Sequence, residues 1–147
     1  PGHTAGSVAL RLGDELALTG DLLFVGSGGR PDLADRAAEW TGWLWRSLER
    51  VRAQWPAALR IFPAHSASEA ERAASRVVEG RLGELAARNP PFAIADEAAF
   101  RAWIEDRVGS FPDAYRRIKR ANLGLGAVDD DLADELEAGK NQCAVTP

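Results

Sequence analysis

Two histidines and one aspartate are the side chains of this sequence whose types and positions best suit metal chemistry. His3 lies near the start of the chain, Asp21 follows Thr-Gly at the end of an apolar run, and His65 follows Phe-Pro-Ala. Imidazole nitrogens and carboxylate oxygens are suitable ligands for zinc, iron or manganese. Each residue alone has an ordinary structural explanation. Because all three lie at the edges of short apolar runs, they are predicted to meet on one rim of a sheet, as part of a metal site.

Short strands are expected to place these three residues. Residues 7–12 and 15–19 are predicted to pair as antiparallel strands, because the Gly13-Asp14 step between them is a hairpin turn signal. A third short apolar run covers residues 22–25. Residues 59–62 are predicted to form the strand that leads to His65.

A glycine-rich loop and an amphipathic helix separate these runs. Residues 26–31 hold three glycines within four positions and are predicted to form a loop whose backbone can approach a ligand closely. Asp32 is predicted to cap a helix that runs to about residue 54. That helix is indicated by apolar residues at spacings of three and four: Ala37, Trp40, Leu44, Leu48 and Val51.

The second part of the chain is predicted to be helical. Residues 68–88 indicate one or two helices, and Asn-Pro-Pro at 89–91 ends them. Asp96 is predicted to cap the next helix, and Phe-Pro-Asp at 111–113 opens another. Residues 122–126 are predicted to form a loop before a last acidic helix over 129–137.

Composition narrows the classes of function. The chain has 147 residues, a net charge of −4 and no apolar run long enough to span a membrane. The net negative charge argues against a nucleic-acid partner and gives no reason to expect binding to a membrane surface. The single cysteine, Cys143, cannot form an internal disulfide, which favours a reducing, cytoplasmic location. Cys143 has no nearby histidine in sequence and is interpreted as incidental.

Four motifs, taken in order, carry a family resemblance. Pro-Gly-His-Thr-x-Gly-Ser, Thr-Gly-Asp-x-Leu-Phe, Gly-Gly-Arg-Pro-Asp-Leu and Pro-Ala-His resemble the second half of the metallo-β-lactamase superfamily. Within it, the chain is most similar to the persulfide dioxygenase and glyoxalase II-like branches. The resemblance implies an α+β fold that forms part of a four-layer αβ/βα sandwich, with strands first and helices after.

The resemblance also implies roles for individual residues. His3, Asp21 and His65 match metal ligands of the family, with Asp21 bridging where two ions are bound. The implied cofactor is one or two divalent ions, Zn²⁺ or Fe²⁺, and no catalytic residue beyond the metal ligands is indicated. Arg30 matches a loop arginine that either binds a substrate carboxylate or braces its loop; its planar guanidinium suits both tasks.

One family motif has no counterpart in this sequence. His-x-His-x-Asp-His would lie upstream of Pro1, and His3 and His65 are the only histidines. The chain is therefore interpreted as the C-terminal portion of one domain, with residues 1–65 as the sheet and metal-site half and 66–147 as the helical part. Without an N-terminal half, an apolar sheet face would be exposed to water, at a free-energy cost of about 25 cal/mol per Å². Poor solubility or pairing, for example as a homo-oligomer, is expected.

Three functions stay open at this point. The first is sulfur oxidation of the persulfide dioxygenase kind, slightly favoured by Gly-Arg-Pro-Asp-Leu. The second is glyoxalase II-like hydrolysis of a thioester by metal-activated water; either substrate would be a small, glutathione-derived thiol compound. The third is a non-catalytic remnant. A binding surface built on Trp40, Trp43 and Trp45 is a further alternative, against the simpler interpretation that they pack in the core.

Overall fold

The computed structural model describes residues 1–33, 36–68, 70–71, 77–108, 113–138 and 143–145. The chain forms two compact units. The first comprises Pro1–Gly109 together with Cys143–Pro147, and the second is Ser110–Gln142. The predicted division at residue 65 separates a strand-rich from a helix-rich part and stays a prediction.

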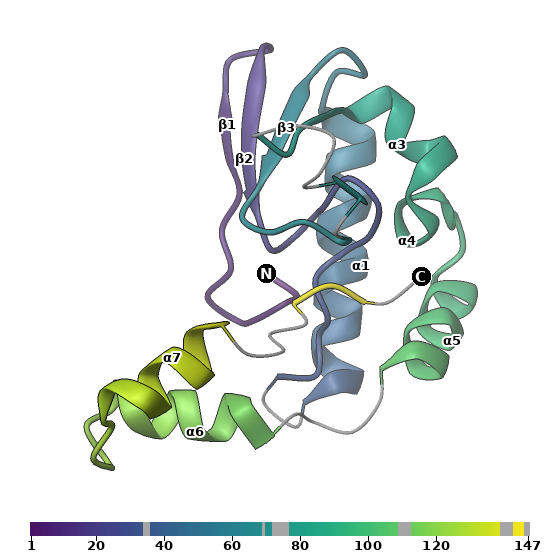
Figure 1. The fold of residues 1–147 in the computed structure, drawn as a ribbon. Helices are drawn as coiled ribbons and strands as arrows, with labels where there is room; N and C mark the ends of the chain where they lie inside the picture. The colour runs from purple at the N-terminus through teal and green to yellow at the C-terminus, as the bar shows by residue number, and fades with distance from the viewer. Residues whose placement is uncertain (34–35, 69, 72–76, 109–112, 139–142, 146–147) are drawn as a thin grey trace. The chain divides into compact units, whose positions relative to one another are not determined.

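A mixed four-stranded sheet organises the first unit (Figure 1). Its strands are β1 (Leu10–Leu12), β2 (Leu16–Gly20), β3 (Arg60–Pro63) and β4 (Gly80–Arg81), in that spatial order. β1 and β2 form the predicted hairpin, β2 and β3 are parallel, and β3 and β4 are antiparallel. Because a parallel pair needs a crossover, the long helix between β2 and β3 is a requirement of this topology. The α+β class is confirmed.

Helix α1 (Ala37–Gln54) covers one face of the sheet (Figure 1). Three residues of its predicted apolar stripe, Leu44, Leu48 and Val51, share one core with the inward strand residues Ala17 and Ile61. The predicted cap is wrong: the helix begins after Arg36, and the Asp32 carboxylate pairs with Arg30 instead. In the apolar run at 22–25, Leu23 makes an isolated bridge to Gly28.

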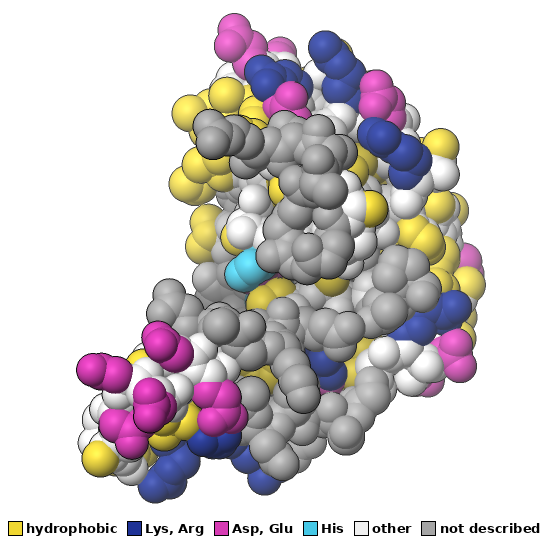
Figure 2. Space-filling model, viewed as in Figure 1, with side chains coloured by type: hydrophobic (Ala, Val, Ile, Leu, Met, Phe, Trp, Pro, Cys, Tyr) yellow, Lys and Arg dark blue, Asp and Glu magenta, His cyan; other side chains and the backbone are white. Residues whose placement is uncertain are grey.

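Over β1 and β2, the opposite face of the sheet is apolar and exposed. Leu10 pairs with Leu18 across the hairpin, and these side chains are 56% and 47% accessible. Leu12, on the same face as Leu10, is 52% accessible. Hydrophobic side chains gather over β1 and β2 in the space-filling view (Figure 2). The expected uncovered apolar face is therefore present in this chain.

Three further helices complete the first unit: α3 (Leu82–Arg88), α4 (Pro90–Ala93) and α5 (Glu97–Arg107). The helical prediction for 68–88 is confirmed at 70–71 and 82–88 and wrong at 77–81, of which 80–81 pair with β3; residues 69 and 72–76 lie outside the described residues. Asp96 caps α5 as predicted. Asn89, 1% accessible, donates to the carbonyl oxygens of Phe24 and Ser27 and so holds the glycine-rich loop.

The second unit is a helix pair. α6 (Asp113–Asn122) and α7 (Asp130–Ala138) are joined by the predicted loop, and an Arg117–Glu135 ion pair of 3.0 Å links them. The predicted start of α6 at 111–112 lies outside the described residues. Among the described helices, none has both the length and the apolar content to cross a bilayer.

Candidate metal centre

Parallel pairing of β2 and β3 brings Asp21 and His65 together. Asp21 directly follows β2 and His65 comes two residues after β3, so both lie at the carboxyl ends of neighbouring strands. The amide of Ala64 donates to the carbonyl of Gly20 at 3.1 Å, which extends the pairing to the rim. The His65 Nδ1 atom lies 2.6 Å from Asp21 Oδ1. The strand ends thus place the two side chains in hydrogen-bond contact.

His3 reaches the same rim from the other side. β1 runs antiparallel to β2, so the segment that precedes β1 lies beside the end of β2. The His3 Nε2 atom lies 3.6 Å from Asp21 Oδ2. The structure therefore brings together all three residues that the sequence suggested, with the Asp21 carboxylate between the two imidazoles.

The hydrogen bonding of His3 favours a ligand role. Its Nδ1 lies 2.9 Å from the carbonyl oxygen of Arg30, and a carbonyl can only accept, so Nδ1 carries the proton and donates. In the neutral ring, Nε2 then offers a lone pair toward a carboxylate oxygen. Two facing acceptors are unfavourable unless a proton or a metal ion lies between them. Metal-binding histidines commonly donate their other ring nitrogen to a carbonyl in this way.

The electrostatics of His3 agree with a neutral ring. Burial lowers the pKa of His3, and this desolvation outweighs the opposing influence of the Asp21 carboxylate and the Arg30 carbonyl. His65 lowers the pKa of His3 further. A depressed pKa keeps the imidazole unprotonated near neutral pH, which is the form that binds a metal.

The spacing of the donors also suits a divalent ion. Two ligands about 2.1 Å from a tetrahedral zinc ion lie roughly 3.4 Å apart. The 3.6 Å between His3 Nε2 and Asp21 Oδ2 is close to that separation. The His3 side chain is 7% accessible and that of His65 is 52%, so the rim is closed on one side and open to solvent on the other. A histidine is visible at the surface in Figure 2.

Close backbone packing fixes the carboxylate. The Thr19 hydroxyl donates to the Leu23 carbonyl at 2.7 Å across the turn that carries Asp21. Gly29 of the glycine-rich loop lies directly over this turn. A Cβ atom at Gly29 would overlap the Asp21 carbonyl oxygen and would lie 2.9 Å from the His3 Cβ. Only glycine permits this approach of the loop to the site.

Arg30 is buried and engaged by a carboxylate. Its Nε and one terminal nitrogen donate to the two oxygens of Asp32 at 2.7 and 2.6 Å. Both side chains are less than a tenth accessible. This bidentate pair supports the bracing role for Arg30, while a substrate contact stays a prediction.

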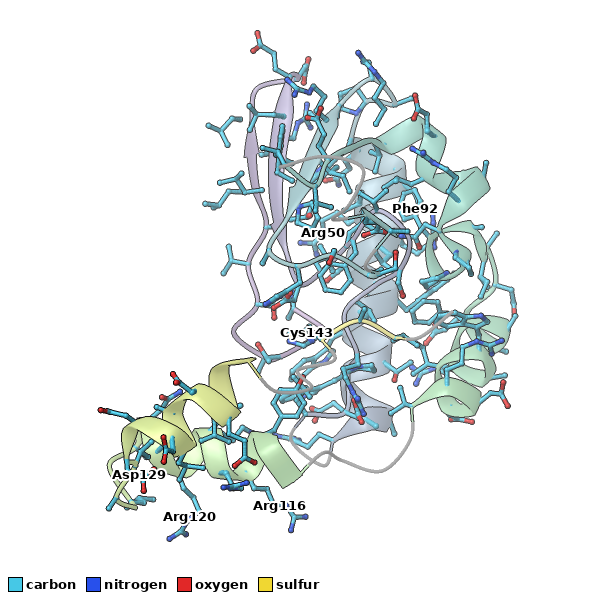
Figure 3. All side chains as sticks on the ribbon, viewed as in Figure 1. Arg50, Phe92, Arg116, Arg120, Asp129 and Cys143 are labelled. Atoms are coloured by element: carbon cyan, nitrogen blue, oxygen red, sulfur yellow. The ribbon has the colours of Figure 1, made fainter. Side chains whose placement is uncertain are left out.

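Cys143 also lies near the site, although no pattern in the sequence indicates this position. One atom each of His3, Asp21 and Cys143, all suited to metal binding, lie within 4.8 Å of one another. Figure 3 shows Cys143 on the C-terminal segment of the first unit. Cys143 follows His65 by 78 positions, and no spacing motif links the two. Only the fold brings the cysteine to the rim.

The tryptophans of α1 serve mainly as packing residues. Trp40 and Trp45 are each 7% accessible, and Trp43 stacks on Trp40 with ring centroids 6.3 Å apart. Trp45 contacts Phe100 of α5 at 5.3 Å. These contacts support the core interpretation over an exposed aromatic binding surface.

Several known proteins are similar to this chain in sequence or in fold. No family model matches the chain. A hydroxyacylglutathione hydrolase from Methylococcus capsulatus is 46% identical over 71 residues, and a probable zinc-dependent hydrolase of polyketide biosynthesis, BaeB, from Bacillus velezensis is 37% identical over 70. A crystal structure of a metallo-β-lactamase from Staphylococcus aureus superposes with a TM-score of 0.68 at 26% identity, over 83% of this chain. The chain is similar in sequence and in fold to the metallo-β-lactamase superfamily.

The relationship to the superfamily covers part of each relative. The matched segments take up 48% and 47% of this chain but only 25% and 29% of the two hydrolases. The superposition covers 37% of the S. aureus metallo-β-lactamase. Both named relatives are hydrolases, and one is described as zinc-dependent.

Proposed function

We propose that this chain contributes to a zinc-dependent hydrolase that cleaves a thioester of a small thiol, of the glyoxalase II kind. The observation that carries the proposal is the Asp21 carboxylate, held between the imidazoles of His3 and His65. The hydroxyacylglutathione hydrolase relative supports a glutathione thioester as the substrate.

The side chains would divide the work by position. His3 Nε2 and Asp21 Oδ2 would hold one divalent ion, while His65, on the other carboxylate oxygen, would hold a second ion or orient Asp21. A bound divalent ion supplies Lewis acidity and lowers the pKa of water to about 7. The open side of the rim beside His65 is where a substrate carbonyl would enter. The ion pair with Asp32 would hold Arg30 in place, and the Arg30 carbonyl oxygen would keep accepting the hydrogen bond from His3 Nδ1.

The proposal requires further ligands from outside this chain. His3 and His65 are the only histidines here, so a His-x-His-x-Asp-His motif in an upstream segment would have to complete the site. The exposed apolar face of β1 and β2 would give that segment a surface on which to pack. Covering it contributes about 25 cal/mol per Å² of apolar area.

The test uses the full-length protein that contains this chain. We expect it to bind zinc and to release thiol from a hydroxyacylglutathione thioester, with loss of both properties in Asp21→Asn. Asp14→Asn is the matched control, because Asp14 lies in the exposed hairpin turn and pairs with Arg11. Zinc binding without hydrolysis of any thioester would contradict the proposed reaction. Absence of metal binding would leave the non-catalytic remnant as the correct description.

Sulfur oxidation by a single iron is the second candidate. The sequence Gly29-Arg30-Pro31-Asp32-Leu33 favours it by resemblance to the persulfide dioxygenase branch. One iron with open positions for dioxygen and a persulfide sulfur would use the same His3 and Asp21. Stoichiometric iron and oxygen uptake with glutathione persulfide, without thioester cleavage, would favour this reaction over hydrolysis.

A further inference from the structure

We propose that the Cys143 thiolate is an additional metal ligand, on the same ion as His3 and Asp21. The inference rests on the metal site proposed above and adds a sulfur donor to it. Suitable atoms of the three side chains lie within 4.8 Å of one another. They come from three separate parts of the chain: the segment before β1, the end of β2 and the C-terminal segment.

Two backbone hydrogen bonds, one to Cys143 and one from Val145, anchor this segment. The Arg30 amide donates to the Cys143 carbonyl at 2.9 Å, and the Val145 amide donates to the Gly28 carbonyl at 2.9 Å. Ala144, between them, forms a bridge with Gly29. The C-terminal segment therefore lies as a short strand along the glycine-rich loop, at the level of the metal site.

Side-chain packing holds the same segment in the core. Val145 is 2% accessible and belongs to the main hydrophobic cluster. Its carbonyl accepts a hydrogen bond from the buried Ser27 hydroxyl at 2.5 Å. Alternate residues of a strand point to opposite faces, so Cys143 and Val145 project to the same side. Burial of Val145 thus fixes the direction of Cys143.

The cysteine and the histidine are tied to one residue. Arg30 donates its amide to Cys143 and accepts from His3 Nδ1 through its carbonyl. The two donors are therefore positioned by opposite groups of the same residue. The fork of the Arg30 side chain on Asp32 limits its movement.

The donor separations are compatible with a shared ion after a small adjustment. Zinc binds thiolate at about 2.3 Å and imidazole or carboxylate at about 2.1 Å, so donors on one ion lie roughly 3.4–3.6 Å apart. The longest separation here is at most 4.8 Å, so a small displacement of the Cys143 sulfur would close the difference. Deprotonation of the thiol on metal binding would accompany this step, with the proton released to solvent.

A sulfur donor would alter the choice of metal. Thiolate favours zinc and other soft or borderline ions over magnesium, calcium or manganese, which prefer oxygen. A set of one imidazole, one carboxylate and one thiolate leaves further positions of the ion for other ligands and for water. Cys143 would therefore raise the preference of the His3–Asp21 site for zinc over manganese.

The experiment uses the full-length protein loaded with cobalt(II) as a spectroscopic substitute for zinc. A thiolate bound to cobalt gives a charge-transfer absorption in the near ultraviolet. We expect this band in the wild type and its loss in Cys143→Ser, with zinc affinity reduced by about tenfold or more. Zinc should also slow alkylation of Cys143, followed by peptide mass spectrometry.

A second variant separates ligation from folding. Ser27→Ala keeps the cysteine but removes the hydroxyl that holds Val145, so the thiolate band should weaken while cobalt stays bound. Cobalt bound without a thiolate band in the folded wild type, with equal zinc affinity in Cys143→Ser, would overturn the role of Cys143 and leave the His3–Asp21 site intact. A wild type that binds neither ion would overturn both the inference and the proposed function.

Discussion

The Nδ1 atom of His3 lies 2.9 Å from the carbonyl oxygen of Arg30, which is 27 residues away in sequence. This hydrogen bond fixes the tautomer and the direction of the imidazole, because it commits Nδ1 as a donor and leaves Nε2 toward Asp21. The glycine-rich loop thereby controls the site without supplying a metal-binding side chain of its own. Changes in this loop should alter metal binding.

Gly29→Ala should weaken both the fold and the site. The new Cβ would overlap the Asp21 carbonyl oxygen, so the loop must move away and take the Arg30 carbonyl with it. We expect the free energy of unfolding to fall by about 1–3 kcal/mol and zinc affinity in the full-length protein to fall as well. Gly126→Ala is the control, since a Cβ there meets nothing within 4 Å. Equal effects of the two substitutions would contradict the packing argument.

Asp32→Asn should destabilise the chain by about 3–5 kcal/mol, because it removes the charge partner of the buried Arg30 guanidinium. The paired replacement Arg30→Met with Asp32→Leu should recover much of this loss, since apolar residues of similar volume can substitute for a buried ion pair. Urea unfolding measures both effects. If Arg30→Lys raised KM without changing stability, Arg30 would be a substrate contact and not a brace.

Acid should destabilise the metal-free protein through His3. Burial lowers the pKa of His3 in the folded state, while the unfolded chain has the ordinary value of about 6.5. The unfolded state therefore binds the proton first as pH falls. The contribution of His3 to stability is complete above about pH 6.5 and declines as pH falls toward the lower folded pKa. Urea titrations across this range should show a smaller decline for His3→Gln.

The two partners of the Asp21 carboxylate predict a graded effect on metal affinity. Asp21→Asn should lower the zinc affinity of the full-length protein by more than about 100-fold, because it removes the negative charge of the carboxylate that lies between His3 and His65. His65→Ala should lower it by about 10–100-fold if His65 orients Asp21. Equilibrium dialysis measures the affinities. A larger loss in His65→Ala than in Asp21→Asn would indicate that His65, rather than Asp21, is the main ligand.

The exposed apolar face predicts association of the 147-residue chain by itself. Leu10 and Leu18 are direct cross-strand partners on that face. The double substitution Leu10→Lys with Leu18→Glu places opposite charges side by side and should shift the chain toward monomer in sedimentation velocity. Leu123→Lys, at another exposed leucine, should leave association unchanged. A wild-type chain that stays monomeric at high concentration would contradict this prediction.

The meeting of His3, Asp21 and His65 at one rim of the sheet could be predicted from the sequence, because strand ends and hairpin turns have local sequence signals. Gly13-Asp14 and the apolar runs indicated the pairing that puts His3, Asp21 and His65 together. The cap at Asp32 failed because a buried arginine two residues earlier binds a carboxylate more strongly than free helix amides do. Such competition depends on tertiary burial and leaves no local pattern.

The role of the C-terminal segment had no signal in the sequence for a different reason. Its contacts join residues more than a hundred positions apart, as in the hydrogen bond of Ser27 to Val145. The short strand β4 was also missed, because two residues are too few to show a periodic pattern. One of them, Gly80, has no side chain and pairs with Ile61 through the backbone. Sequence periodicity reports local elements and not their distant partners.

The Ser27–Val145 hydrogen bond, across 118 positions, also sets an order of events during synthesis. The hairpin of β1 and β2 can form soon after it leaves the ribosome, because its contacts are local. The segment at 143–145 emerges more than a hundred residues after this hairpin, and its docking closes a very long loop. Until that segment emerges, His3 and Asp21 would be without the Cys143 thiol beside them. A nascent chain stalled before residue 143 should therefore hold a metal less tightly than the released protein.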